Sequence, residues 1–199
     1  MIYYDIMKLV KIFDKMNIIK RDLNLIITTP ISYLYSFTYN NSDKIQIRPF
    51  DPKIKKLGLT LINQIKVLYP DITILFQGSA ALELPGQADI DLVIPCLPIN
   101  FSKYYPGLRG ILGQPSKIKT DFIEWHTSIN KVNIELLLIN PKIPMYTEPY
   151  KIYKIFTTFP DTVIQYKHLK LRCHGISTRE YKRRRLYFFN QLIKQFPQI

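Results

Sequence analysis

Two aspartates separated by one residue are the part of the sequence best suited to bind a metal ion. Asp89 and Asp91 belong to the run 89–95, in which isoleucine or leucine occupies every second position. This alternation predicts a β-strand, and side chains two residues apart on a strand project from the same face. Adjacent carboxylates raise each other's pKa unless a cation lies between them. Oxygen ligands suit Mg²⁺ or Mn²⁺, so the pair predicts a divalent metal site.

A glycine and a serine upstream of the aspartates are suited to hold a phosphate. Gly78 and Ser79 follow the apolar run 72–77, a predicted buried strand, and residues 80–84 are predicted to form a short helix. Backbone N–H groups at a helix N-terminus bind anions, and glycine lets the anion approach closely. A phosphate site beside a metal site is the arrangement used for in-line phosphoryl or nucleotidyl transfer.

The segments on either side of this motif contain both helix and strand signals. Asp51-Pro52 is typical of a helix start, and the apolar stripe that follows ends at Pro70. Residues 121–129 and 132–139 are strand-like, and Asn130-Lys131 between them predicts an antiparallel hairpin.

The C-terminal part of the chain is predicted to be helical. An apolar stripe covers residues 152–156, and Asp161 is predicted to cap a helix over residues 162–172. Ser177 with Glu180 is a capping box that opens a final helix. The fold class expected from the whole pattern is α+β, a mixed β-sheet flanked by helices with a C-terminal helical tail.

Charge and composition favour a globular protein with an anionic partner. The 199 residues contain 28 Lys and Arg against 15 Asp and Glu, a net charge of +13, and 47% are hydrophobic. This hydrophobic content excludes a wholly disordered chain. The positive charge favours a nucleic acid, a nucleotide or an acidic surface. A codon bias toward Ile, Lys, Asn and Tyr is an alternative source of the same charge.

The sequence predicts a cytoplasmic protein without a membrane span. Cys96 and Cys173 are the two cysteines and imply no disulfide framework. Residues 1–15 do not resemble a signal peptide, and no apolar stretch is long enough to span a bilayer. Residues 1–44 differ in pattern from the rest and are predicted to be a helical N-terminal appendage of unknown role, preceding a domain over residues 45–199.

Gly-Ser followed by Asp-x-Asp on a strand resembles the polymerase β-like nucleotidyltransferase superfamily, and residues 45–195 resemble its GrpB-like family. Three further features carry this resemblance: the segment 48–52, the Pro85-Gly86 turn, and the tail residues Tyr166, Leu169, Lys170, Tyr181, Arg185 and Phe188. In the tail, Arg185 stands where the family pattern has lysine. The resemblance implies a nucleotidyltransferase fold for the domain.

The resemblance also implies a set of site residues. Asp89 and Asp91 would bind Mg²⁺ or Mn²⁺ together with a third carboxylate on a neighbouring strand. Glu135 is the expected third residue, and Asn133 and Glu124 are the alternatives.

The expected donor is a nucleoside triphosphate. Gly78 and Ser79 would hold its β- and γ-phosphates, and Lys170 and Arg185 would reach its phosphates. Lys103 and Arg109 are weaker candidates for acceptor or phosphate contacts.

The function implied is a metal-dependent nucleotidyltransferase that moves a nucleoside monophosphate from the triphosphate to an acceptor hydroxyl. Asp89, Asp91 and Glu135 would be its catalytic residues. One alternative is a catalytically inactive module of the same fold that binds a nucleotide or RNA through its basic tail. Another is an interaction protein that docks a partner through residues 1–44. The sequence does not identify the acceptor.

Overall fold

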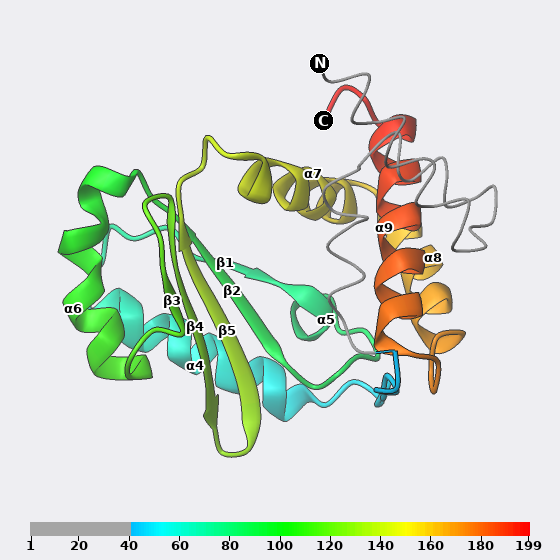
Figure 1. Ribbon diagram of the computed structural model, residues 1–199, viewed down its shortest axis with the longest axis horizontal. Coiled ribbons are helices and arrows are strands. Elements are labelled where there is room, and N and C mark those ends of the chain that lie inside the picture. The colour runs from blue at the N-terminus through cyan, green and yellow to red at the C-terminus, as the bar shows by residue number, and fades with distance from the viewer. Residues whose placement is uncertain (1–40) are drawn as a thin grey trace.

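The computed structural model of the protein describes residues 41–199 (Figure 1). The predicted N-terminal appendage, residues 1–44, therefore lies outside the described residues except at its end. Lys44 forms an isolated antiparallel bridge with Ser177, and the backbone N–H of Ile45 donates to the carbonyl of Ile176 at 2.9 Å. The chain thus enters the described domain alongside the turn that precedes the last helix.

A five-stranded sheet is the centre of the structure, with the strand order β1-β2-β5-β4-β3. The strands are β1 (Leu75–Gln77), β2 (Ile90–Pro95), β3 (Lys117–Ile118), β4 (Phe122–Ile129) and β5 (Val132–Ile139). β2 and β5 run parallel, and the other neighbouring pairs are antiparallel. The fold class is therefore α+β with a mixed sheet, as the sequence predicts.

Helices flank this sheet and form the C-terminal tail. They are α4 (Pro52–Leu68), α5 (Gly78–Ala81), α6 (Phe101–Leu112), α7 (Pro144–Thr158), α8 (Pro160–Leu171) and α9 (Thr178–Gln195), with a 3-10 turn η1 (Pro98–Asn100). In Figure 1, α6 lies at one end of the sheet, whereas α8 and α9 stand together at the other end, near α5. No helix within residues 41–199 is long and apolar enough to cross a membrane.

One face of the sheet is apolar and packs against α4 and α6. On β2, Ile90, Leu92 and Ile94 are buried in this core, and the residues between them are only partly buried. Trp125 on β4 belongs to the same core and is fully buried. Because side chains alternate along a strand, the polar residues between these positions project from the opposite face. Asp91 is one of them.

The predicted hairpin is confirmed. β4 and β5 pair along their whole lengths, with His126 opposite Glu135. Asn130 and Lys131 at the tip have φ angles of 52° and 66°. Positive φ at both central residues is the conformation of a type I′ turn, whose twist matches that of the two strands.

The predicted helix caps are confirmed at two helices and wrong at a third. The side chain of Asp51 accepts the N–H of Lys53 at 2.9 Å at the start of α4, and that of Ser177 accepts the N–H of Glu180 at 3.2 Å at the start of α9. Asp161 does not cap α8, because that helix begins one residue earlier, at a proline. Proline is preorganised for the first helical position, which leaves Asp161 within the first turn.

Two predicted elements before the aspartates are shorter than expected. The predicted strand over residues 72–77 is reduced to β1, because the N–H of Ile72 donates to the carbonyl of Tyr69 in a turn after α4. The predicted helix over residues 80–84 is the single turn α5, which begins at Gly78. Glu83 has φ of 56° and ends the helical conformation.

Candidate functional site

The parallel pairing of β2 and β5 brings two of the predicted carboxylates together. Asp91 on β2 lies opposite Glu135 on β5, so that their side chains project from the same face of the sheet. Asp89 stands two residues before Asp91, at the entrance to β2. Asp89 and Glu135 both raise the pKa of Asp91 electrostatically, which places all three carboxyl groups in one cluster.

The surroundings of Asp91 disfavour its ionised form. Its pKa is raised from 3.8 to about 7, first by burial and then by the negative charges of Asp89 and Glu135. Arg185 and Lys170 act in the opposite direction and lower its pKa. A carboxyl group with this balance is partly protonated at neutral pH, and a cation beside it would restore the charged form.

The structure places the two alternatives to Glu135 differently. Asn133 lies two residues earlier on β5 and borders the same cleft as the carboxylates. Glu124 lies on β4, where Oε2 is 3.4 Å from the Nζ of Lys117 and Oε1 is 3.3 Å from the Nε2 of His126. Glu124 therefore has cationic or polar partners of its own, whereas Glu135 is the register partner of Asp91.

Glu124, His126 and Glu135 form a further group of potential ligands on this face of the sheet. One ligand atom from each lies within 4.8 Å of the others. The Nδ1 of His126 is 4.0 Å from the Oε2 of Glu135. In the sequence, His126 has no metal-ligand spacing with the cysteines, so no local pattern indicates it as a ligand. The hairpin register, which sets His126 opposite Glu135, is what brings it to the site.

Gly78 lies directly against Asp91. Its φ is +73°, and a Cβ added to it would overlap the Oδ2 of Asp91. Both facts require glycine here: positive φ is strained for other residues, and the carboxylate occupies the space of a side chain. The glycine predicted to form part of a phosphate cradle thus also forms one wall around the partly buried aspartate.

Ser79 faces the loop that leads to the aspartates. A Cβ added to Gly86 in that loop would meet the Cβ and Oγ of Ser79 at 2.5 Å and the Nζ of Lys170 at 3.7 Å. Two backbone hydrogen bonds between Arg48 and Gly86, of 2.7 and 2.9 Å, tie the loop to the segment before α4. Serine, glycine and a lysine from α8 therefore converge beside α5.

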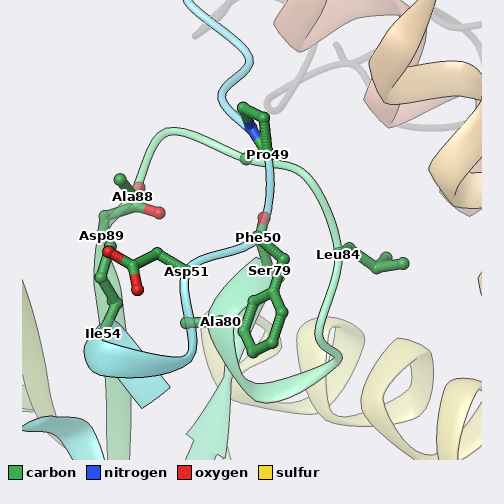
Figure 2. Close-up of a pocket in the computed structure, with 10 residues that line it drawn as sticks. Pro49, Phe50, Asp51, Ile54, Ser79, Ala80, Leu84, Ala88 and Asp89 are labelled. Atoms are coloured by element: carbon green, nitrogen blue, oxygen red, sulfur yellow. The ribbon is translucent and has the colours of Figure 1, made fainter. Parts of the chain in front are cut away.

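Figure 2 shows the space enclosed between these segments. The cavity is only about 10 Å³ and is bordered by Asp51, Ser79 and Asp89, which come from the start of α4, from α5 and from the loop before β2. Ala88 in that loop has φ of 64°. The cavity is too small for a ligand and marks where these three segments meet.

Lys170 and Arg185 approach the acids from the C-terminal helices. Lys170 on α8 is 3% exposed, its Nζ donates to the Oη of Tyr181 at 3.2 Å, and it lies 5.1 Å from the ring centroid of Tyr166. The guanidinium of Arg185 on α9 lies 5.9 Å from the ring of Tyr181. Both cations lower the pKa of Asp91, so both lie within electrostatic reach of it.

Lys182 is a site residue that sequence reasoning missed. Its pKa is lowered from 10.5 to about 8, first by the positive charge of Arg185 and then by burial. This shift is opposed by the negative charges of Glu135, Asp91 and Asp89, so the ammonium group interacts electrostatically with all three acids. A usable signal existed: Lys182 and Arg185 are three residues apart and share a helix face.

Other predicted basic candidates lie elsewhere or have nearby partners. Lys103 is on α6, at the far end of the sheet in Figure 1, and its Nζ is 2.6 Å from the Oδ2 of Asp71. Arg109 is on the same helix. Arg183 and Arg184 on α9 form ion pairs with Glu180 at 3.4 and 2.8 Å. The four consecutive basic residues 182–185 of α9 are therefore partly neutralised by Glu180 on the same helix.

A polar cleft of about 610 Å³ opens beside the carboxylates. We call it the hairpin cleft, because most of its wall is the β4–β5 hairpin. Its lining residues are Gln87, Asp89, Asp91, His126, Thr127, Ser128, Asn133, Ile134 and Glu135. The cations of the site thus come from α8 and α9, the glycine–serine turn from α5, and most of the cleft wall from β4 and β5.

The chain was compared with family models and with curated proteins. No family model matches the chain, and no curated protein matches it. The resemblance to the GrpB-like family therefore stays a prediction from the sequence, and the function has to be argued from the site itself.

Proposed function

We propose that the protein is a metal-dependent nucleotidyltransferase with the nucleotidyltransferase fold of the GrpB-like family. In this reaction a nucleoside monophosphate moves from a nucleoside triphosphate to an acceptor hydroxyl. The observation that carries the proposal is the environment of Asp91, a carboxyl group held between Asp89, Glu135 and the turn at Gly78. In this arrangement neighbouring carboxyl groups repel one another when they are ionised, and groups able to bind phosphate lie beside them.

The donor atoms of the site fit a divalent cation. Asp89, Asp91 and Glu135 offer carboxylate oxygens, which are the ligands that Mg²⁺ and Mn²⁺ prefer. The raised pKa of Asp91 supports the same conclusion, because a cation would stabilise the carboxylate form. Bound there, the metal would neutralise charge on the triphosphate and on the leaving pyrophosphate.

The residues toward α8 and α9 fit the polyphosphate of the donor. Lys170, Lys182 and Arg185 all interact electrostatically with Asp91, and the Nζ of Lys170 lies with Ser79 beside Gly86. α5 is one helical turn, so only a few backbone N–H groups are free there and the cations must supply most of the attraction.

The reaction then needs few other groups. As the acceptor oxygen forms its bond to the α-phosphorus, the bond from that phosphorus to the bridging oxygen breaks and pyrophosphate leaves. Glu135, exposed at 48% of its side chain, is placed to accept the proton of the acceptor hydroxyl. Catalysis comes mainly from positioning and charge neutralisation, because phosphoryl-group transfer asks little covalent chemistry of the protein.

Incubation with an α-labelled nucleoside triphosphate, Mg²⁺ and a cell extract tests this proposal. We expect label in a new product together with released pyrophosphate, and loss of both in Asp91→Asn. Asp71→Asn is the matched control, since Asp71 pairs with Lys103 away from the site. Nucleotide binding without any label transfer would instead favour the inactive binding module.

A further inference from the structure

The hairpin cleft differs in charge from the rest of the site. Asp89, Asp91 and Glu135 line it, and its other polar lining groups are the side chains of Gln87, His126, Thr127, Ser128 and Asn133. Of the residues that the structure describes, no lysine or arginine lines it. This composition stands out in a chain with a net charge of +13.

The lysines and arginine of the site come from the C-terminal helices and do not line the cleft. Lys170 belongs to α8, and Lys182 and Arg185 belong to α9. In Figure 1 these helices stand beyond α5 and β1, whereas the cleft is formed at the β4–β5 hairpin. The lysines and arginine of the site therefore come from helices that do not line the cleft, and the cleft itself contains carboxylates and neutral or imidazole side chains.

We propose that the hairpin cleft binds the acceptor, and that the acceptor is a small polyhydroxyl compound, neutral or amino-bearing, without phosphate or carboxylate groups. This inference rests on the proposed function, because it assigns the second substrate of the same site. Hydroxyl groups of such a compound find hydrogen-bonding partners in the amides of Gln87 and Asn133 and in the hydroxyl of Ser128. The volume of about 610 Å³ is within the range of small-molecule sites.

Charge disfavours the other classes of acceptor. A sugar phosphate, a nucleotide or an RNA end would place its negative charge against Asp89, Asp91 and Glu135 with no lysine or arginine in the cleft walls. Divalent ions bound by the acids would also bind the triphosphate of the donor, and so would be only partly available to an anionic acceptor. An amino group on the acceptor would be attracted electrostatically by the same carboxylates. In the reaction, the acceptor hydroxyl loses its proton to Glu135 and its oxygen forms the bond to the α-phosphorus.

Ligand-observed NMR with the full chain tests the charge preference directly, without requiring turnover. The probes are matched sets that differ in charge: glucose, glucosamine and glucose 6-phosphate, then ribose and ribose 5-phosphate, then a short oligoribonucleotide. Each set is measured with Mg²⁺, in the presence and absence of a non-hydrolysable nucleoside triphosphate analogue.

Two variants locate the binding. Ser128→Arg places a cation in the cleft at an exposed position, where the larger side chain is expected to leave folding unchanged. Ser102→Arg makes the same change at an exposed position on α6, at the opposite end of the sheet, and is the control.

We expect at least a tenfold preference for neutral or amino-bearing members over their phosphorylated partners. Ser128→Arg should reverse that preference, and Ser102→Arg should leave it unchanged. The nucleotide analogue should not displace the polyol, because the cleft is lined by none of the cations proposed to bind the triphosphate.

The inference is overturned if phosphorylated probes or the oligoribonucleotide bind best, if no neutral or amino-bearing probe binds, or if the analogue competes with the polyol. Binding of the nucleoside triphosphate analogue tests the proposed function separately. If the analogue does not bind in the presence of Mg²⁺, the proposed function is contradicted, whether or not the polyol probes bind. Normal analogue binding combined with preference for phosphorylated probes contradicts only the acceptor assignment.

Discussion

Asp91 on β2 lies directly opposite Glu135 on the parallel strand β5, and their carboxyl groups share one face of the sheet. The pairing of two strands far apart in sequence therefore concentrates negative charge beside a glycine turn. Gly78→Ala should lower the free energy of unfolding by on the order of 1–3 kcal/mol and weaken nucleotide binding, because φ is +73° and the new methyl group meets Asp91.

Gly113→Ala is the matched control for this change. Gly113 has a similar φ of +83°, but an added Cβ there would meet nothing within 4 Å. Urea unfolding of the two variants separates backbone strain, common to both, from the overlap with Asp91. Equal destabilisation of the two, with unchanged nucleotide binding, would show that the contact between Gly78 and Asp91 has no role.

The raised pKa of Asp91 predicts a pH-dependent stability. In the folded protein this pKa is about 7, against 3.8 for the ordinary group. The native state therefore binds more protons than the unfolded state between these values, so the contribution of Asp91 to stability is lost as pH rises toward and through 7. The linked change in the free energy of unfolding is on the order of 2–4 kcal/mol.

Urea unfolding at about pH 5, 6, 7 and 8 measures this dependence of stability on pH. Asp91→Asn should be relatively more stable than the parent at the upper end of the range, and Mg²⁺ should stabilise the parent there but not the variant. A difference between parent and variant that does not change with pH would contradict the assigned pKa.

Lys182 is expected to contribute to nucleotide affinity. Lys182→Met should weaken binding about tenfold, which corresponds to one charge-assisted contact. Its pKa of about 8 in the free protein predicts that the parent loses affinity as pH rises above 8, since the neutral amine no longer attracts phosphate.

Calorimetric titrations at neutral and alkaline pH check both expectations for Lys182. Lys194→Met is the control, because Lys194 is an exposed lysine on the same helix. Equal effects of the two substitutions would show that only the net charge of α9 matters.

Tyr181 is predicted to position Lys170. Tyr181→Phe removes the hydroxyl that accepts a hydrogen bond from the Nζ of Lys170 at 3.2 Å. Leaving a buried ammonium with one partner fewer costs about 1–3 kcal/mol in unfolding free energy. Tyr187→Phe, at a 36% exposed position on α9, should change stability little. Thermal unfolding of both variants provides the comparison.

The local features of the fold could be predicted from the sequence. The caps at Asp51 and Ser177 and the turn at Asn130-Lys131 depend on residues adjacent in the chain, and all are observed. α6 was not anticipated, because Pro106 and two glycines lower its helix propensity. It forms because it covers one face of the sheet, where Leu108 is fully buried.

The candidate site was only partly predictable, because it depends on how segments distant in the sequence pair and pack. Glu135 and Asn133 share a face of one strand, so sequence alone left the choice between them open. The register of β5 with β2 sets Glu135, and not Asn133, opposite Asp91. The positions of Lys182 and of the hairpin cleft likewise depend on how distant segments pack, which no local pattern contains.

The most direct test of the account is calorimetric titration of a non-hydrolysable nucleoside triphosphate analogue into the parent, Asp91→Asn and Asp71→Asn, each with Mg²⁺ and with EDTA. The account predicts binding by the parent and by Asp71→Asn only when Mg²⁺ is present, and none by Asp91→Asn. Binding by Asp91→Asn as tight as that of the parent, or binding that is unchanged by EDTA, would contradict it.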